Sequence, residues 1–119
     1  MLTPALRMDA VPQAVIEVDI ADLIVRHPEY AVDDVDGLNH FSGLRFSLNN
    51  SVPAAVLCYD GFPAGTATIY FDINVTDVAE ITALVDRVVA ALDIGVERVL
   101  WQRHHGENSP EWDALVARR

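Results

Sequence analysis

Alternation of apolar and polar positions is clearest in the middle of the chain, where three runs predict three β-strands. In the first run Leu44, Phe46 and Leu48 alternate with polar residues, and the second run, residues 54–59, is continuously apolar. The third run, residues 66–74, alternates with a period of two. Turn-forming residues separate the runs, so we predict an antiparallel β-meander.

Beyond residue 75 the apolar period changes from two to 3.6, which predicts one long amphipathic helix over residues 76–94. Thr76 is suited to cap its N-terminus, and Gly95 stands where a left-handed residue would end it. The apolar stripe of this helix is expected to pack on the apolar face of the strand over 66–74. The opposite face would then be open to solvent or to a partner, and it carries Thr66, Thr68, Tyr70, Asp72 and Asn74.

Weaker patterns precede this centre. Residues 14–18 form a short apolar run that fits a strand or a helix equally well. Asp19 offers an N-cap to a short helix over residues 20–27, where apolar positions share one face. Residues 31–40 have no sustained period and are rich in turn-favouring residues, which predicts an acidic loop.

After the long helix, residues 96–103 predict a further strand, and Ser109-Pro110 the start of a terminal helix. The order is therefore α-β-β-β-α-β-α, with the strands grouped. This predicts an α+β two-layer sandwich, in which the helix over 76–94 packs on the meander and a further strand. The length fits a single domain spanning 1–119, with residues 1–13 expected to be extended or poorly ordered.

Composition narrows the range of partners. The 119 residues carry 18 Asp and Glu against 8 basic residues, a formal net charge of −10. This charge argues against nucleic acid and anionic membranes, which select basic proteins. All eight basic residues are arginine, a bias typical of a GC-rich bacterial genome, and chemistry that needs a lysine is excluded.

The only cysteine, Cys58, lies in an apolar run and is expected to be a buried strand residue. The N-terminal residues lack the apolar stretch of a signal peptide, and no run is long and apolar enough to span a bilayer. A cytoplasmic location is therefore expected.

The sequence offers no nucleophile motif and no metal-ligand spacing, so we predict no catalytic residue, no metal and no cofactor. His104 and His105 would point apart on a continuing strand, and His27 and His40 are interpreted as ordinary surface residues. The glycine-containing segment 60–65 joins two strands without a supporting basic residue, so it is interpreted as a hairpin loop rather than a phosphate cradle.

The negative charge is concentrated in the first 40 residues, which carry eight carboxylates and two arginines. Such a field attracts and orients a partner of opposite charge. The leading hypothesis is therefore a small protein-binding module that captures a basic surface of another protein. Bacterial immunity proteins, antitoxins and secretion chaperones share this profile. The residues expected to bind the partner are Asp19, Asp22, Glu29, Asp33, Asp34, Asp36, Arg45, Tyr70 and Asp72.

Two other hypotheses remain open. In the first, a dimeric protein of ferredoxin-like type, an enzyme or a binding protein, holds a small molecule in a pocket near Tyr70, Asp72, Trp101 and His104. In the second, the open sheet face packs against copies of the chain, as in a homodimer or a structural assembly. The absence of motifs leans against an enzyme without excluding one.

Overall fold

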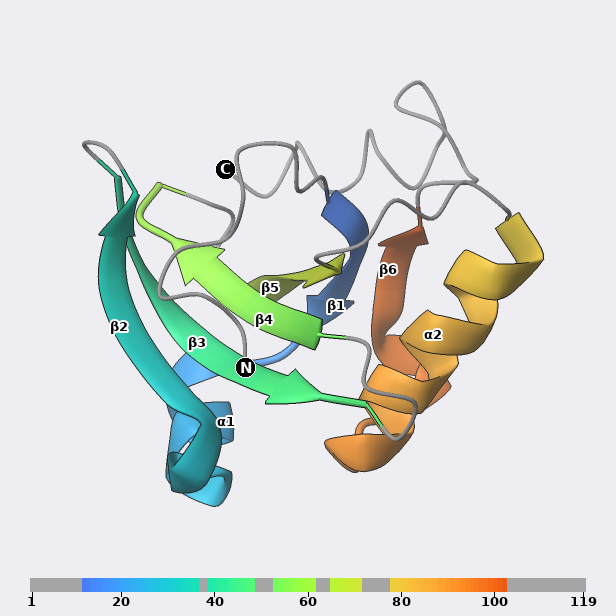
Figure 1. The fold of residues 1–119 in the computed structure, drawn as a ribbon, viewed down its shortest axis with the longest axis horizontal. Coiled ribbons are helices and arrows are strands. Elements are labelled where there is room, and N and C mark those ends of the chain that lie inside the picture. The colour runs from blue at the N-terminus through green and yellow to red at the C-terminus, as the bar shows by residue number, and fades with distance from the viewer. Residues whose placement is uncertain (1–11, 37–38, 49–52, 62–64, 72–77, 103–119) are drawn as a thin grey trace.

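The described strands of the protein form one sheet. The computed structural model in Figure 1 describes residues 12–36, 39–48, 53–61, 65–71 and 78–102. Within them, six antiparallel strands follow the spatial order β2-β3-β4-β5-β1-β6. The strands are β1 (Pro12–Glu17), β2 (Ala31–Asp36), β3 (Asn39–Ser47), β4 (Pro53–Tyr59), β5 (Thr66–Phe71) and β6 (Val99–Gln102). The helices are α1 (Ile20–Arg26) and α2 (Val78–Ala91), with short 3₁₀ turns at Pro28–Tyr30 and Val96–Arg98. The fold is therefore a small α+β fold.

The predicted meander is confirmed as strands β3, β4 and β5. The register pairs Leu44 with Val56 and Val56 with Ile69, so these three side chains lie on one face of the sheet. All three are fully buried in the main core. β3 begins at Asn39, earlier than its alternating pattern predicted, because its first residues pair with β2.

The apolar run over 14–18 is largely strand β1, which lies inside the sheet between β5 and β6. Ala14 and Ile16 belong to the main core, whereas Val15 packs with Trp101 in a separate cluster. Burial on both sides explains why the run shows no alternation. From β1 the chain passes through α1 to reach β2 at the far edge of the sheet.

The short helix predicted over 20–27 is confirmed as α1. Asp19 caps its N-terminus, where the carboxylate Oδ1 accepts a hydrogen bond of 3.0 Å from the backbone N–H of Ala21. Leu23 is buried in the main core. Arg26 ends the helix and donates a 3.3 Å hydrogen bond to the carbonyl of Leu92, which ties α1 to the C-terminal end of α2.

Helix α2 packs on the face of the sheet that carries Ala67, Ile69 and Phe71, as its apolar stripe predicted. Its buried side chains come at helical spacing from one side: Ile81, Leu84, Val85, Val88 and Val89. Thr76, the predicted N-cap, lies outside the described residues.

The predicted C-cap of this helix was wrong. The left-handed residue is Asp93, with φ of 57°, whereas Gly95 is extended with φ of −68°. The N–H of Asp93 donates to Ala90 at 3.1 Å, and that of Ile94 donates to Val89 at 2.8 Å, which is the Schellman arrangement. Ile94 thereby turns back into the core. The helix ends here because the apolar contact of Ile94, rather than the glycine, fixes the turn.

The predicted acidic loop over 31–40 was also wrong. Residues Ala31 to Asp36 form β2 and pair in continuous register with β3, from Ala31 opposite Leu44 to Asp36 opposite Asn39. Aspartate disfavours strands in isolation, but pairing with a neighbouring strand outweighs this preference. The helix-first order predicted from the sequence changes accordingly, because strand β1 precedes α1 and a hairpin replaces the loop.

At the C-terminal end, the strand predicted over 96–103 is confirmed in its second half as β6, after a 3₁₀ turn. The terminal helix predicted to start near Pro110 lies outside the described residues. In the described part of the chain, neither helix has the length and apolar character needed to span a membrane.

Candidate functional site

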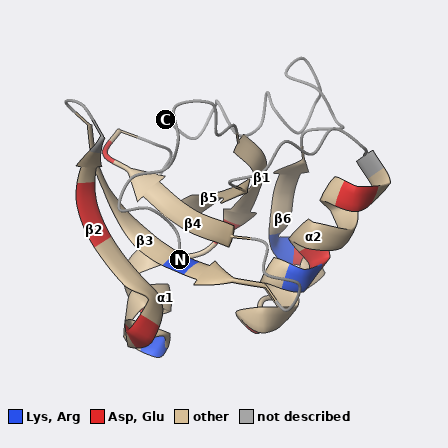
Figure 2. Cartoon of the chain, in the orientation of Figure 1, with Lys and Arg blue, Asp and Glu red and all other residues tan. Residues whose placement is uncertain are grey.

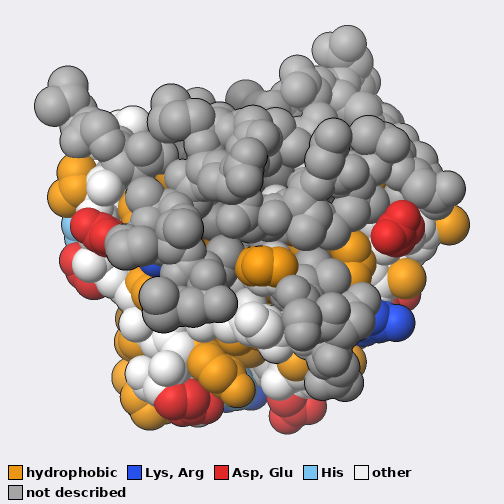
Figure 3. All heavy atoms as spheres, viewed as in Figure 1, with side chains coloured by type: hydrophobic (Ala, Val, Ile, Leu, Met, Phe, Trp, Pro, Cys, Tyr) orange, Lys and Arg blue, Asp and Glu red, His pale blue; other side chains and the backbone are white. Residues whose placement is uncertain are grey.

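Consecutive elements at one margin of the sheet carry most of the predicted partner-binding carboxylates. These elements are α1, the 3₁₀ turn after it, and the edge strand β2. Figure 2 shows acidic residues on both α1 and β2, and Figure 3 shows acidic side chains at the corresponding parts of the surface. The exposed members are Asp19, Asp22, Glu29, Asp33 and Asp34. The side chain of Asp36 lies outside what the structure describes.

These carboxylates differ in what they contact. Asp19 caps α1, and Asp22 lies 3.6 Å from Arg26 one helical turn later, so part of their charge is balanced locally. The side chain of Glu29 is exposed and makes no hydrogen bond or ion pair with the described residues. Because the surface charge is partly compensated on α1, the strongest uncompensated field is expected near Glu29 and Asp34.

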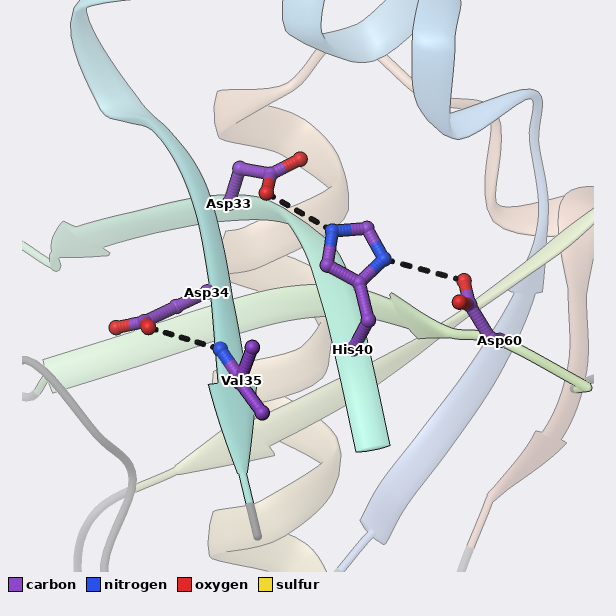
Figure 4. A network of polar contacts seen from close by, with 5 residues as sticks. All are labelled: Asp33, Asp34, Val35, His40 and Asp60. Atoms are coloured by element: carbon purple, nitrogen blue, oxygen red, sulfur yellow. Dashed lines mark hydrogen bonds and ion pairs between the residues drawn. The ribbon is translucent and has the colours of Figure 1, made fainter. Parts of the chain in front are cut away.

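On β2, neighbouring carboxylates point to different places. Val35 stands opposite His40, and Asp33 comes two residues before Val35, so Asp33 and His40 share one face of the sheet. This is the face that bears the helices, because His40 lies four residues before Leu44, a main-core residue of the same strand. Asp34 belongs to the other face, and its carboxylate accepts a 2.8 Å hydrogen bond from the backbone N–H of Val35 (Figure 4). Asp33 and Asp34, which are neighbours in the acidic run of the sequence, therefore lie on opposite faces of the sheet.

His40 lies between two carboxylates from different elements (Figure 4). Its Nε2 is 2.8 Å from Asp33 Oδ1 on β2, and its Nδ1 is 3.3 Å from Asp60 Oδ1 in the turn after β4. The hydrogen bond to Asp33, followed by the one to Asp60, raises the pKa of His40 above its ordinary value. When protonated, the ring donates to both carboxylates and bridges the edge strand to the turn after β4.

Sequence reasoning missed this cluster by treating His40 as an ordinary surface residue and Asp60 as part of a hairpin loop. The three residues are separated along the chain, and they meet because β2, β3 and β4 are adjacent in the sheet. The only signal that could have found them is the register of the two hairpins, which depends on recognising β2 as a strand.

We expect the His40 cluster to make folding stability depend on pH. Below the ordinary histidine pKa of about 6.5 the ring is protonated in both folded and unfolded chains, and its stabilisation is complete. As the pH rises through the higher folded-state pKa, the folded protein also loses the proton and the stabilisation disappears. Urea unfolding of the wild type and of His40→Gln should therefore differ more at about pH 6 than at about pH 9. An equal difference at both values would contradict the bridge, and an NMR titration of the ring reports the pKa directly.

The predicted open face of β5 was wrong for its described residues. Thr66, Thr68 and Tyr70 are all buried, and Tyr70 packs in a second cluster with Phe41, Ala55 and Leu57. Arg45 is half-buried, with its guanidinium carbon 5.7 Å from the centre of the Phe41 ring. Asp72 lies outside the described residues. Tyr70 and Arg45 therefore contribute to the packing of this second face.

The residues predicted for the alternative small-molecule site do not form one site in the described part of the structure. Tyr70 and Trp101 are both buried, but they belong to different apolar clusters. Asp72 and His104 lie outside the described residues. Two pockets of about 350 and 460 Å³ lie instead around Tyr30 and Phe46, whose rings are 5.4 Å apart, and neither pocket is lined by Tyr70 or Trp101.

The described residues were also compared with the requirements of a metal site and of a reactive thiol. Within the described ranges, no group of three or more His, Cys, Asp and Glu side chains is placed to hold a metal ion. The two nitrogens of His40 contact different carboxylates on opposite sides of the ring. Cys58 is half-buried on β4, and burial raises the pKa of its thiol, which disfavours the reactive thiolate.

Comparisons of the chain with models of protein families, with curated proteins and with solved structures find no match.

Proposed function

We propose that this chain is a protein-binding module that captures a basic surface of another protein through its acidic margin. We define the acidic margin as Asp19, Asp22, Glu29, Asp33 and Asp34, carried by α1, the turn after it and β2. The observation that carries the proposal is the exposure of all five carboxylates along consecutive elements at one edge of the sheet. Fields of one sign speed association with partners of opposite charge and select against like-charged ones.

We also propose a fold for the scaffold that carries the acidic margin. Main-core residues of both helices pack with one face of the sheet, which supports a two-layer α+β sandwich as its scaffold. A rigid scaffold fixes the relative positions of the carboxylates before binding, so that less conformational entropy is lost on association. We propose that such a module acts in the bacterial cytoplasm, in the manner of an immunity protein, an antitoxin or a chaperone.

A flexible synthetic peptide of arginine and glycine tests the proposal. We expect the double variant Glu29→Gln, Asp34→Asn to bind it about tenfold more weakly than the wild type at low ionic strength. The affinity of the wild type should also fall as salt is added, because salt screens exposed charges. Both readouts can be followed by fluorescence anisotropy of a labelled peptide.

The matched control is Glu80→Gln, Asp86→Asn, which removes the same types of charge from exposed positions on α2. We expect it to weaken binding by less than about threefold. Equal losses for the two double variants would show that only net charge matters, and affinity independent of salt would show that capture is not electrostatic. Either result would contradict the proposal.

A further inference from the structure

Among the described strands, β2 lies at one edge of the sheet. No described strand lies beyond β2, and the side chain of Val35 is 54% exposed. The carbonyl of His40 accepts a 3.0 Å hydrogen bond from Asp60 on the β4 side, so His40 directs its backbone groups away from β2. Val35, opposite His40, therefore belongs to a non-hydrogen-bonded pair, and its N–H and C=O point to the open edge.

The same alternation directs the backbone groups of Asp33 to the open edge, whereas the N–H of Ala31 donates to the carbonyl of Pro28 in the preceding turn. Asp33 and Val35 thus present donors and acceptors outward, two residues apart, in the spacing that an added strand requires. Such edges pair readily with further strands, and natural proteins block them or use them.

Asp34 occupies one of these outward groups. Its carboxylate accepts the hydrogen bond from the Val35 N–H at 2.8 Å, on the side of β2 away from His40 (Figure 4). This bond is exposed to water, so its net contribution is small and an incoming carbonyl can replace it. Once displaced, the Asp34 carboxylate has lost its donor and is free to pair with a cation.

We propose that β2 binds its partner by strand addition, and that the occupant is an extended segment in which basic and apolar residues alternate. This inference rests on the proposed function and names the binding mode. A carbonyl of the segment takes the Val35 N–H, and a basic side chain pairs with the released Asp34 carboxylate. On the other face, its apolar side chains cover Val35, next to the Asp33 carboxylate that His40 already contacts.

The charge of β2 argues against a second copy of this chain as the occupant. Pairing of two β2 strands would bring Asp33 and Asp34 of each copy close to the carboxylates of the other, and like charges across strands destabilise a pair. A basic segment gains from the same positions.

The test compares two synthetic peptides of Arg-Val repeats with identical side chains. One has ordinary backbone amides, and the other is methylated at successive backbone nitrogens so that neither edge can pair. We expect the methylated peptide to bind about tenfold more weakly or worse, because it loses several backbone hydrogen bonds. NMR amide shifts should place the ordinary peptide along β2.

Variants of the protein give a second readout. Val35→Pro removes an N–H that points away from β3, so the sheet retains its ladder, and we expect about tenfold weaker binding of the ordinary peptide. Val35→Thr keeps the N–H and should stay within about twofold. If Val35→Pro does not fold, the pair of peptides still decides the question.

The outcomes separate the two proposals. Equal, salt-dependent binding of both peptides, or shifts confined to other strands, would overturn strand addition and leave electrostatic capture standing. Failure of both peptides, and of the arginine-glycine peptide, to bind would overturn both proposals. Loss with the methylated peptide and with Val35→Pro would support strand addition.

Discussion

Gly43→Ala is expected to destabilise the protein by about 3 kcal/mol, a large share of the stability of a domain of this size. Gly43 is buried on β3, between Val32 of β2 and Leu57 of β4. A Cβ at this position would overlap the carbonyl oxygen of Val56 and lie 2.9 Å from the Cα of Leu57. Both are backbone atoms of a paired strand, so relief requires the strands to separate.

The matched control is Gly61→Ala in the turn after β4. Gly61 has φ of 88°, which strains an alanine, but apart from its chain neighbours no atom of the described residues lies within 4 Å of the added Cβ. We expect a loss of about 1 kcal/mol from backbone strain alone. Urea unfolding followed by circular dichroism measures both variants. Similar losses for the two would show that β3 and β4 do not approach as closely at Gly43 as the structure indicates.

The Gly43 variant also bears on the binding edge. Within the described sheet, β2 pairs only with β3, and Gly43 is the β3 residue opposite Val32. Loosening this contact should therefore increase hydrogen exchange of β2 amides before the rest of the sheet opens. The attachment of the proposed binding strand to the sheet therefore depends on Gly43, where the close β4 backbone leaves no room for a side chain.

Sequence patterns predicted the elements that bury a single face. β5 and α2 show their periods because one side of each packs on the main core, as Ile69 and Val85 illustrate. β1 was ambiguous because it is buried on both sides, and β2 was missed because its strand character comes from pairing with β3 rather than from its own residues. These two strands position the whole acidic margin relative to the sheet.

The candidate site was predictable only as a set of charges. The concentration of carboxylates before residue 40 is visible in the sequence, and five of them are exposed in the structure. The division of Asp33 and Asp34 between a histidine and the open edge follows from strand register, which the sequence does not encode locally. Tyr70 was misassigned because a tyrosine on an alternating strand suits an exposed face and a buried one equally well.

Trp101→Ala is the second variant with a large expected effect, about 3–5 kcal/mol of lost stability. Trp101 is 1% exposed on β6 and packs against Val15 of β1, where it joins the last strand to the sheet. Removing the indole leaves a cavity that the paired strands can close only in part. Thermal or urea unfolding followed by far-ultraviolet circular dichroism measures the loss.

This variant separates the core from the small-molecule interpretation of the same residue. A tryptophan lining a ligand pocket can be shortened with little effect on folding, whereas a core tryptophan cannot. Trp101→Phe retains most of the apolar volume and should cost less than Trp101→Ala, and Leu100→Ala, at a half-buried neighbour on the same strand, should cost less again. An unchanged unfolding midpoint for Trp101→Ala would remove Trp101 from the core and restore the pocket with Tyr70 as the better hypothesis. The expected order of losses, alanine above phenylalanine above the Leu100 variant, instead assigns Trp101 to the core between β6 and β1.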